Sequence, residues 1–386
     1  MKRNIFVFTF IALALVLGMH LAWAAEPLRF PENPSFTTLV TTPLAIEGLT
    51  GDNAGNLYTS LRNAGAGIPC PVWKINLAGG PPVVVGYLPT PSATTQCGPS
   101  GLAFNSSGDL FFADGDRISF FTPNSVSPPT ATVYATGVPG TNGLAFDRNG
   151  NLWTGDGITG QGRVWKISTG GGVAQEVFRI QPMNNSANFG GAVTNPGVGR
   201  ANTTIPGTAQ NLVANGIAFN REGDMFVIDT ARGALWKVQF DRQGNLRSPT
   251  GCDATFTTNT LCLSNIFVAH PFLEGGDGIA LDEAGNIWVD ANERNAVAIV
   301  TKDGRVSEIF RNTPDTTTKL RNGGPLEFPT SPVLSGKVFC TANSDGDRRD
   351  NSPNTAGEIK PAGPSVGKIS CLDQELIIRG LPLPVR

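Results

Sequence analysis

One repeated unit runs through most of this chain and constrains its fold more than any other feature. The clearest copy is residues 142–156, NGLAFDRNGNLWTGD, and close relatives of it are residues 215–229 and 277–290. Two earlier copies begin at Glu47 and Ser100, and an irregular sixth covers about residues 327–369. A unit that recurs along a chain in this way is the signature of repeat architectures such as propellers and solenoids.

Each unit predicts four short antiparallel strands. An apolar strand meets a tight turn rich in Asn, Asp and Gly, and an alternating second strand follows. A third strand such as Val164–Ile167 and a fourth such as Val306–Ile309 complete the unit. Six such units predict an all-β, six-bladed β-propeller with four antiparallel strands per blade. A long β-sandwich or two separate β domains are the alternatives, and the regular phasing of the repeat disfavours both.

The domain organisation follows from this repeat. Residues 25–386 are expected to form a single propeller domain, with Phe36–Val40 supplying the outer strand of the last blade. A Gly-, Asn- and Thr-rich stretch at about residues 170–213 predicts an insertion loop. Residues 343–364 form a second polar excursion within the last blade.

The N-terminal residues predict export. Lys2 and Arg3 precede the apolar run Ile5–Gly18, and Ala22–Ala24 offers a small-x-small cleavage site. An uncleaved anchor is the alternative, although the run is short for a membrane span. Cleavage after residue 24 would remove two of 29 basic residues and none of 31 acidic ones, which leaves a mildly acidic chain. That balance lacks the basic footprint of a nucleic-acid-binding protein.

Six cysteines remain beyond the signal segment. An even number in an oxidising compartment favours disulfides over a thiolate metal site, and no C-x-x-C pair is present. Joining sequence neighbours predicts the pairs Cys70–Cys97, Cys252–Cys262 and Cys340–Cys371.

One column of the repeat suggests a site. The residue before each Gly-Leu-Ala-Phe-like strand carries a side-chain oxygen in every clear copy: Glu47, Ser100, Asn142, Asn215 and Asp277. Because first strands line a propeller's channel, Glu47, Asn142, Asn215 and Asp277 are expected on one ring. Such residues also cap turns, which is the structural alternative.

Two carboxylates and two amides suit a hard cation. Ca²⁺ takes oxygen ligands of this kind, whereas Zn²⁺ prefers nitrogen and sulfur. Only His270 remains after signal cleavage. Ca²⁺ is therefore favoured, with Mg²⁺, Mn²⁺ or Zn²⁺ as alternatives. A second column comprises Asp114, Asp156, Asp229 and Asp290, at the ends of the second strands. Their carboxylates are expected to bond backbone groups, and Asp229 is the best candidate for a secondary role.

These motifs in their order resemble the regucalcin/gluconolactonase/luciferin-regenerating enzyme family of calcium-dependent six-bladed propellers. The resemblance is carried by residues 46–48, 214–219 and 276–289. It implies that Glu47, Asn215 and Asp277 hold the metal and that Asn142 lies beside the substrate. Ser100, from the same column, is a further substrate-binding candidate.

The resemblance also implies hydrolysis of a lactone or related ester, with Asp277 as base or nucleophile. A non-catalytic, calcium-stabilised propeller that binds a protein or glycan is the first alternative. An enzyme of another class on the same fold, using His270, is the second. We expect a secreted or periplasmic monomer that acts on a small molecule, without nucleic acid and without a membrane span after cleavage.

Overall fold

The computed structural model describes residues 30–31, 33–52, 54–181, 213–317, 321, 323–344 and 366–384. The signal segment predicted over residues 1–24 lies outside these residues, as do 182–212 and 345–365 of the two excursions.

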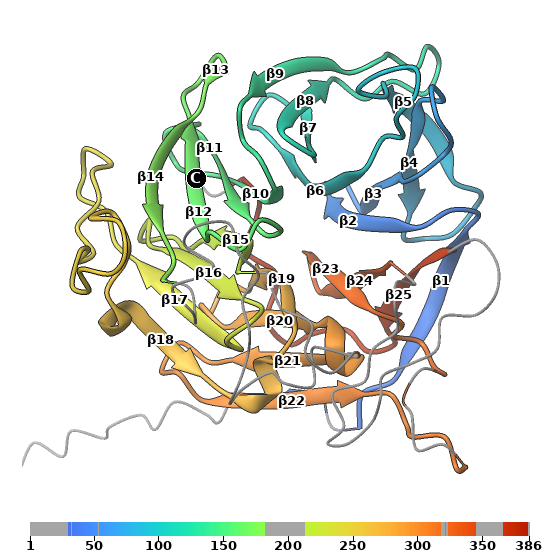
Figure 1. The fold of residues 1–386 in the computed structure, drawn as a ribbon. Coiled ribbons are helices and arrows are strands. Elements are labelled where there is room, and N and C mark those ends of the chain that lie inside the picture. Colours follow the sequence, from blue (N-terminus) through green and yellow to red (C-terminus); the bar gives the residue numbers. More distant parts are fainter. Residues whose placement is uncertain are drawn as a thin grey trace, which may run out of the picture.

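The chain forms six small antiparallel sheets arranged in a ring around a central channel (Figure 1). From the channel outwards, the strands of blades one to three are β2 (Ile46–Gly51), β3 (Asn56–Leu61), β4 (Cys70–Asn76) and β5 (Val83–Leu88); β6 (Pro99–Phe104), β7 (Leu110–Asp114), β8 (Arg117–Phe121) and β9 (Thr132–Thr136); and β10 (Thr141–Phe146), β11 (Leu152–Asp156), β12 (Arg163–Ile167) and β14 (Gln175–Arg179).

Blades four to six complete the ring. Their strands are β15 (Ala214–Phe219), β16 (Met225–Asp229), β17 (Ala234–Val238) and β18 (Ile266–Ala269); β19 (Gly276–Leu281), β20 (Ile287–Ala291), β21 (Ala296–Val300) and β22 (Val306–Arg311); and β23 (Pro329–Ser335), β24 (Val338–Asn343), β25 (Gly367–Leu372) and β1 (Phe36–Thr42). The six-bladed propeller expected from the repeat is thus confirmed. Among the described residues, helix is confined to the short 3₁₀ turns η3 (Leu263–Asn265), η4 (Pro271–Leu273) and η5 (Asn292–Arg294).

The ring closes as the sequence predicted. Strand β1 pairs antiparallel with β25, so the N-terminal strand becomes the outer edge of the last blade (Figure 1). Closure of this kind ties the two ends of the domain together and leaves no blade with only three strands.

The range predicted as an insertion loop begins with regular structure. Its first residues form β13 (Gly172–Val173), which adds in parallel to β9 of the preceding blade, and then β14, the outer strand of blade three. The polar composition of this stretch hid the strand, because an outer strand faces solvent and needs few apolar residues.

A repeated turn explains why the first two strands of each blade form a hairpin. In blade three, Asp147 accepts hydrogen bonds from the backbone N–H groups of Asn149 and Asn151, from the Asn151 side chain and from Trp153 Nε1, at 2.8–3.0 Å. Asp282 holds the corresponding turn of blade five in the same way. One carboxylate thereby fixes the turn and anchors a core aromatic residue.

All three predicted disulfides form: Cys70–Cys97, Cys252–Cys262 and Cys340–Cys371. The last joins adjacent strands β24 and β25 at the base of the second excursion. In the part of the chain that the structure describes, no helix has the length and apolar character to span a bilayer.

Candidate functional site

The first strands bring the predicted column of polar residues to one ring. The glycine after each column residue packs against the backbone carbonyl of the next column residue around the channel. Gly143, for example, faces the Asn215 carbonyl so closely that an added Cβ would lie 2.7 Å from its oxygen. Only glycine permits this approach. The ring is Glu47, Ser100, Asn142, Asn215, Asp277 and, in blade six, Thr330.

Thr330 shows how the irregular sixth copy of the repeat aligns with the other five. Its backbone oxygen faces Gly278, and its hydroxyl donates to the Glu47 carbonyl at 2.7 Å, which joins the last blade to the first. The sequence signal was weak here because β23 contains prolines in place of the Gly-Leu-Ala-Phe pattern.

In blades one, four and five, a second residue supports the ring residue from within its own blade. It lies fifteen positions later, just after the second strand. Asn215 Nδ2 donates to Thr230 Oγ1 at 3.1 Å, and Asn292 Nδ2 donates to Asp277 Oδ2 at 2.8 Å. In blade one, Arg62 forms an ion pair with Glu47. Sequence reasoning missed this supporting set, although its constant spacing from the ring residues could have revealed it.

The donor set fits a hard cation. Asn215 is 1% exposed, and its Oδ1 accepts no hydrogen bond from any described residue. Thr230 fixes the amide, because its hydroxyl accepts from Asn215 and donates to the Gly276 carbonyl. Asp290 Oδ1 and Asn292 Oδ1 are likewise buried and unpartnered among the described residues. Unsatisfied buried oxygens are costly unless something binds them.

Carboxylates alone do not make this site. Among the described residues, no three His, Cys, Asp or Glu side chains are grouped closely enough to hold a metal ion. A cation here would therefore depend on amide oxygens as well as on Glu47 and Asp277, in keeping with the mixed ligands that Ca²⁺ takes.

Electrostatics also favour a cation. Burial raises the pKa of Asp277 to about 7, opposed by hydrogen bonds from Asn292 and Asn215 and by the charge of Arg62. Burial raises the pKa of Asp290 well above its usual value, and the charge of Asp277 adds to this effect. Arg62 forms an ion pair with Glu47 and its charge also acts on Asp277, so two ring carboxylates share one guanidinium.

The second column holds for three of its four members. Asp114, Asp156 and Asp229 each accept from a backbone N–H group and pair with an arginine, as the backbone-bonding interpretation predicted. Asp229 is saturated by Arg232 and Trp236, which leaves no support for a secondary site role.

Asp290 does not belong to that column. Asp156 and Asp229 pair across the sheet with Thr141 and Ala214, but the residue opposite Gly276 is Ala291. Asp290 precedes it by one residue, and successive residues of a strand point to opposite faces. It therefore meets the Thr341 hydroxyl and the charge of Asp277 rather than an arginine.

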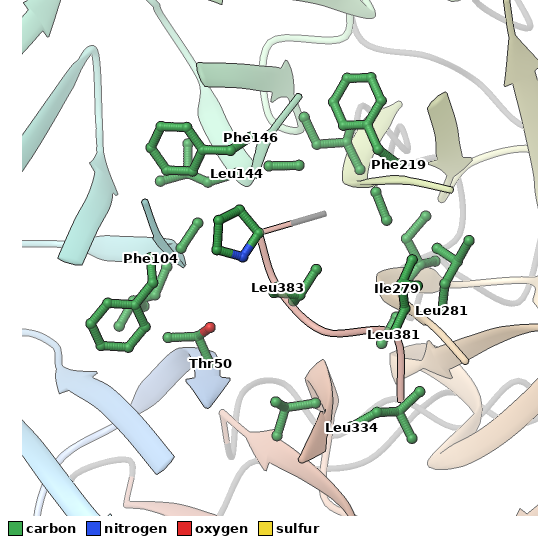
Figure 2. Close-up of a pocket in the computed structure, with 18 of the residues that line it drawn as sticks. Thr50, Phe104, Leu144, Phe146, Phe219, Ile279, Leu281, Leu334, Leu381 and Leu383 are labelled. Carbon is green, nitrogen blue, oxygen red and sulfur yellow. The ribbon is translucent and has the colours of Figure 1, made fainter. Parts of the chain in front are cut away.

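The opposite end of the channel is apolar. The later residues of the first strands line a cavity there, and the C-terminal residues Leu381 and Leu383 lie across it (Figure 2). The Leu381 backbone N–H donates to the Leu281 carbonyl at 2.8 Å, which fixes this segment to blade five. Among the described residues that line this cavity, none has a titratable side chain.

His270 has a structural role. It follows the outer strand β18, and its Nδ1 accepts from the Phe272 N–H at 3.1 Å while its ring contacts the Phe272 ring. This capping interaction begins η4.

Comparisons with known proteins agree with this architecture. Residues 195–326 match the family model described as SMP-30/Gluconolactonase/LRE-like region. That range contains Asn215 and Asp277, and it confirms over this part of the chain the resemblance predicted from the motifs. No curated protein matches the sequence.

Several solved structures share the fold across most of the chain. A luciferin-regenerating enzyme matches with a TM-score of 0.53 and 14% identity, covering 90% of this chain and 97% of its own. Regucalcin from Agrobacterium tumefaciens, described as a calcium-binding protein, matches with a TM-score of 0.51 and 18% identity, covering 89% of this chain and 94% of its own. The PQQ-bound aldose sugar dehydrogenase from Streptomyces coelicolor matches with a TM-score of 0.52 and 14% identity, covering 88% of this chain and 99% of its own. Identities this low show the fold alone.

Proposed function

We propose that this chain, a six-bladed propeller carrying an SMP-30/gluconolactonase/LRE-like region, is a calcium-dependent hydrolase of lactones or related esters. The observation that carries the proposal is the buried Oδ1 of Asn215, which has no partner among the described residues and lies beside the Asp277 carboxyl in a ring with excess negative charge. Glu47, Asn215 and Asp277 would hold the ion.

The bound ion would polarise the substrate carbonyl as a Lewis acid. The chain's own residues position and activate the reacting groups. Asn292 holds Asp277 through Oδ2, and the carboxylate would accept a proton from water or attack the carbonyl carbon. Asn142 and Ser100, on the same ring, would contact the substrate. The Ser100 hydroxyl donates to the Thr141 carbonyl at 3.1 Å, so its oxygen can still accept a hydrogen bond.

The ring would be reached from its own end of the channel. The other end is lined by apolar side chains and crossed by the C-terminal segment (Figure 2).

We further propose that the protein works outside the cytoplasm, as a secreted or periplasmic monomer that acts on a small molecule. Three disulfides support this location, because such bonds persist in oxidising compartments.

Asp277→Asn is the decisive variant, because it removes one charge and keeps the shape of the side chain. We expect it to lose calcium binding, measured by titration calorimetry after chelator treatment, and to lose lactone hydrolysis, measured by pH-stat. The matched control is Asp303→Asn, which makes the same change at an exposed turn. Hydrolysis at wild-type rate in Asp277→Asn would refute the mechanism. Calcium binding with no turnover on any lactone or ester would favour the calcium-stabilised binding propeller.

A further inference from the structure

We propose that Arg62 is an anion-binding residue of this channel, and that the site accepts a ligand bearing a carboxylate. This inference rests on the proposed function, because it names the substrate class: a lactone or ester that carries a free carboxylate besides its scissile bond.

In the other blades, the described residue at the position of Arg62 is uncharged. Arg62 follows β3 directly and supports the ring residue of its blade, as Thr230 and Asn292 do in theirs. The corresponding residues of blades two and three are Gly115 and Gly157. A long cationic side chain in this set is not needed for folding, since glycine, threonine and asparagine serve elsewhere.

The guanidinium is only partly satisfied. Arg62 pairs with Glu47, but its Nε is buried and donates to no acceptor among the described residues. Its side chain is 27% exposed, so solvent reaches part of it. Arginine presents five donors in a planar fork, and one carboxylate partner leaves part of that fork open.

A bound cation would free more of Arg62. Glu47 and Asp277 are the ring carboxylates that attract this guanidinium, and both are proposed ligands of the ion; Asp114, outside the ring, also attracts it but already pairs with Arg117. An ion neutralising both would leave the guanidinium beside a second positive centre. A carboxylate on the ligand restores the balance, and the planar fork matches it in two hydrogen bonds.

The alternative explanation is that Arg62 only neutralises Glu47. That explanation predicts lower stability in an Arg62 variant but no change in the choice of ligand. Ligand preference, rather than stability, therefore separates the two explanations.

The test compares two probes of the same size: 5-hydroxypentanoate and its neutral amide, 5-hydroxypentanamide. Their dissociation constants are measured by calorimetry on calcium-loaded wild type, Arg62→Gln and Arg62→Lys. We expect wild type to prefer the carboxylate. Arg62→Gln should weaken carboxylate binding by about 10- to 100-fold and leave amide binding within about twofold. Arg62→Lys should lie between them, because it keeps the charge and loses the fork. Arg221→Gln is the control for net charge at an exposed site.

A kinetic arm uses isocitric acid lactone, which carries carboxylates, and neutral δ-valerolactone. The ratio of their kcat/KM values should fall in Arg62→Gln by the same factor as the binding ratio. If both ratios stay at the wild-type value, while wild type binds calcium and hydrolyses δ-valerolactone, the Arg62 inference is overturned and the proposed function stands. If wild type binds no calcium, the proposed function fails, and a carboxylate preference lost in Arg62→Gln still supports the anion site.

Discussion

Replacing Gly216 with alanine tests how the ring is built. Gly216 lies in β15 between two ring residues in space, Asn215 of its own blade and Asp277 of the next. A Cβ added there would overlap the Asp277 carbonyl oxygen and lie 2.9 Å from Gly278 Cα, where ordinary contact begins near 3.4 Å. Both neighbours are backbone atoms, so blades four and five would have to separate by about 0.5 Å or more.

Overpacking of this kind costs about 1–3 kcal/mol, and contact with rigid backbone puts the expected loss at about 3 kcal/mol. The measurement is the free energy of unfolding in guanidinium chloride. Separating the blades also moves Asn215 away from Asp277, so calcium affinity should fall at least about tenfold. Gly323→Ala is the matched control, because nothing lies within 4 Å of a Cβ added there. Equal stability and calcium affinity in the two variants would refute the close-packed ring.

Three further predictions concern other parts of the molecule. Asp282→Ala should destabilise the protein by about 3 kcal/mol, because four hydrogen-bond donors lose their acceptor in a buried turn. The same change at an exposed turn, Asp241→Ala, should cost under about 1 kcal/mol. Equal denaturation midpoints of the two variants would contradict this. Replacing both Cys340 and Cys371 with serine should lower the free energy of unfolding by about 3–4 kcal/mol, and replacing Cys252 and Cys262 should lower it by about 2–3 kcal/mol. The first disulfide closes a loop of 31 residues and the second a loop of 10. The reverse order of stability in denaturation would contradict the loop argument. Calcium affinity should rise as pH increases through about 7 and level off at higher pH. The raised pKa of Asp277 means that the ion-free carboxyl holds a proton below that pH, and the ion must displace it. A constant affinity in calorimetry at pH 6, 7 and 8 would contradict this prediction.

Much of this architecture was predictable because the repeat records it directly. Column residues such as Asn215 and Asp277 are polar where the strand pattern calls for apolar residues, and the glycine after each is required by the close approach of the next blade. The closing strand β1 and the three disulfides followed from counting strands and cysteines.

The rest depended on register and on contacts between blades. Asp290 sits one residue closer to its ring residue than Asp229 does, and that single step turns its carboxylate to the other face of the sheet. Arg62 carries no motif of its own, and only its pairing with Glu47 places it at the ring. Thr330 was obscured because prolines replace the repeat in β23.

The central claim is that hydrolysis depends on an ion held by the ring. The most direct measurement is turnover of a panel of aliphatic, aromatic and sugar lactones by chelator-treated protein, before and after calcium is restored. We predict that chelation abolishes turnover and that calcium restores it. Turnover that persists in protein shown to be free of calcium, or its absence in protein shown to hold calcium, would contradict the account.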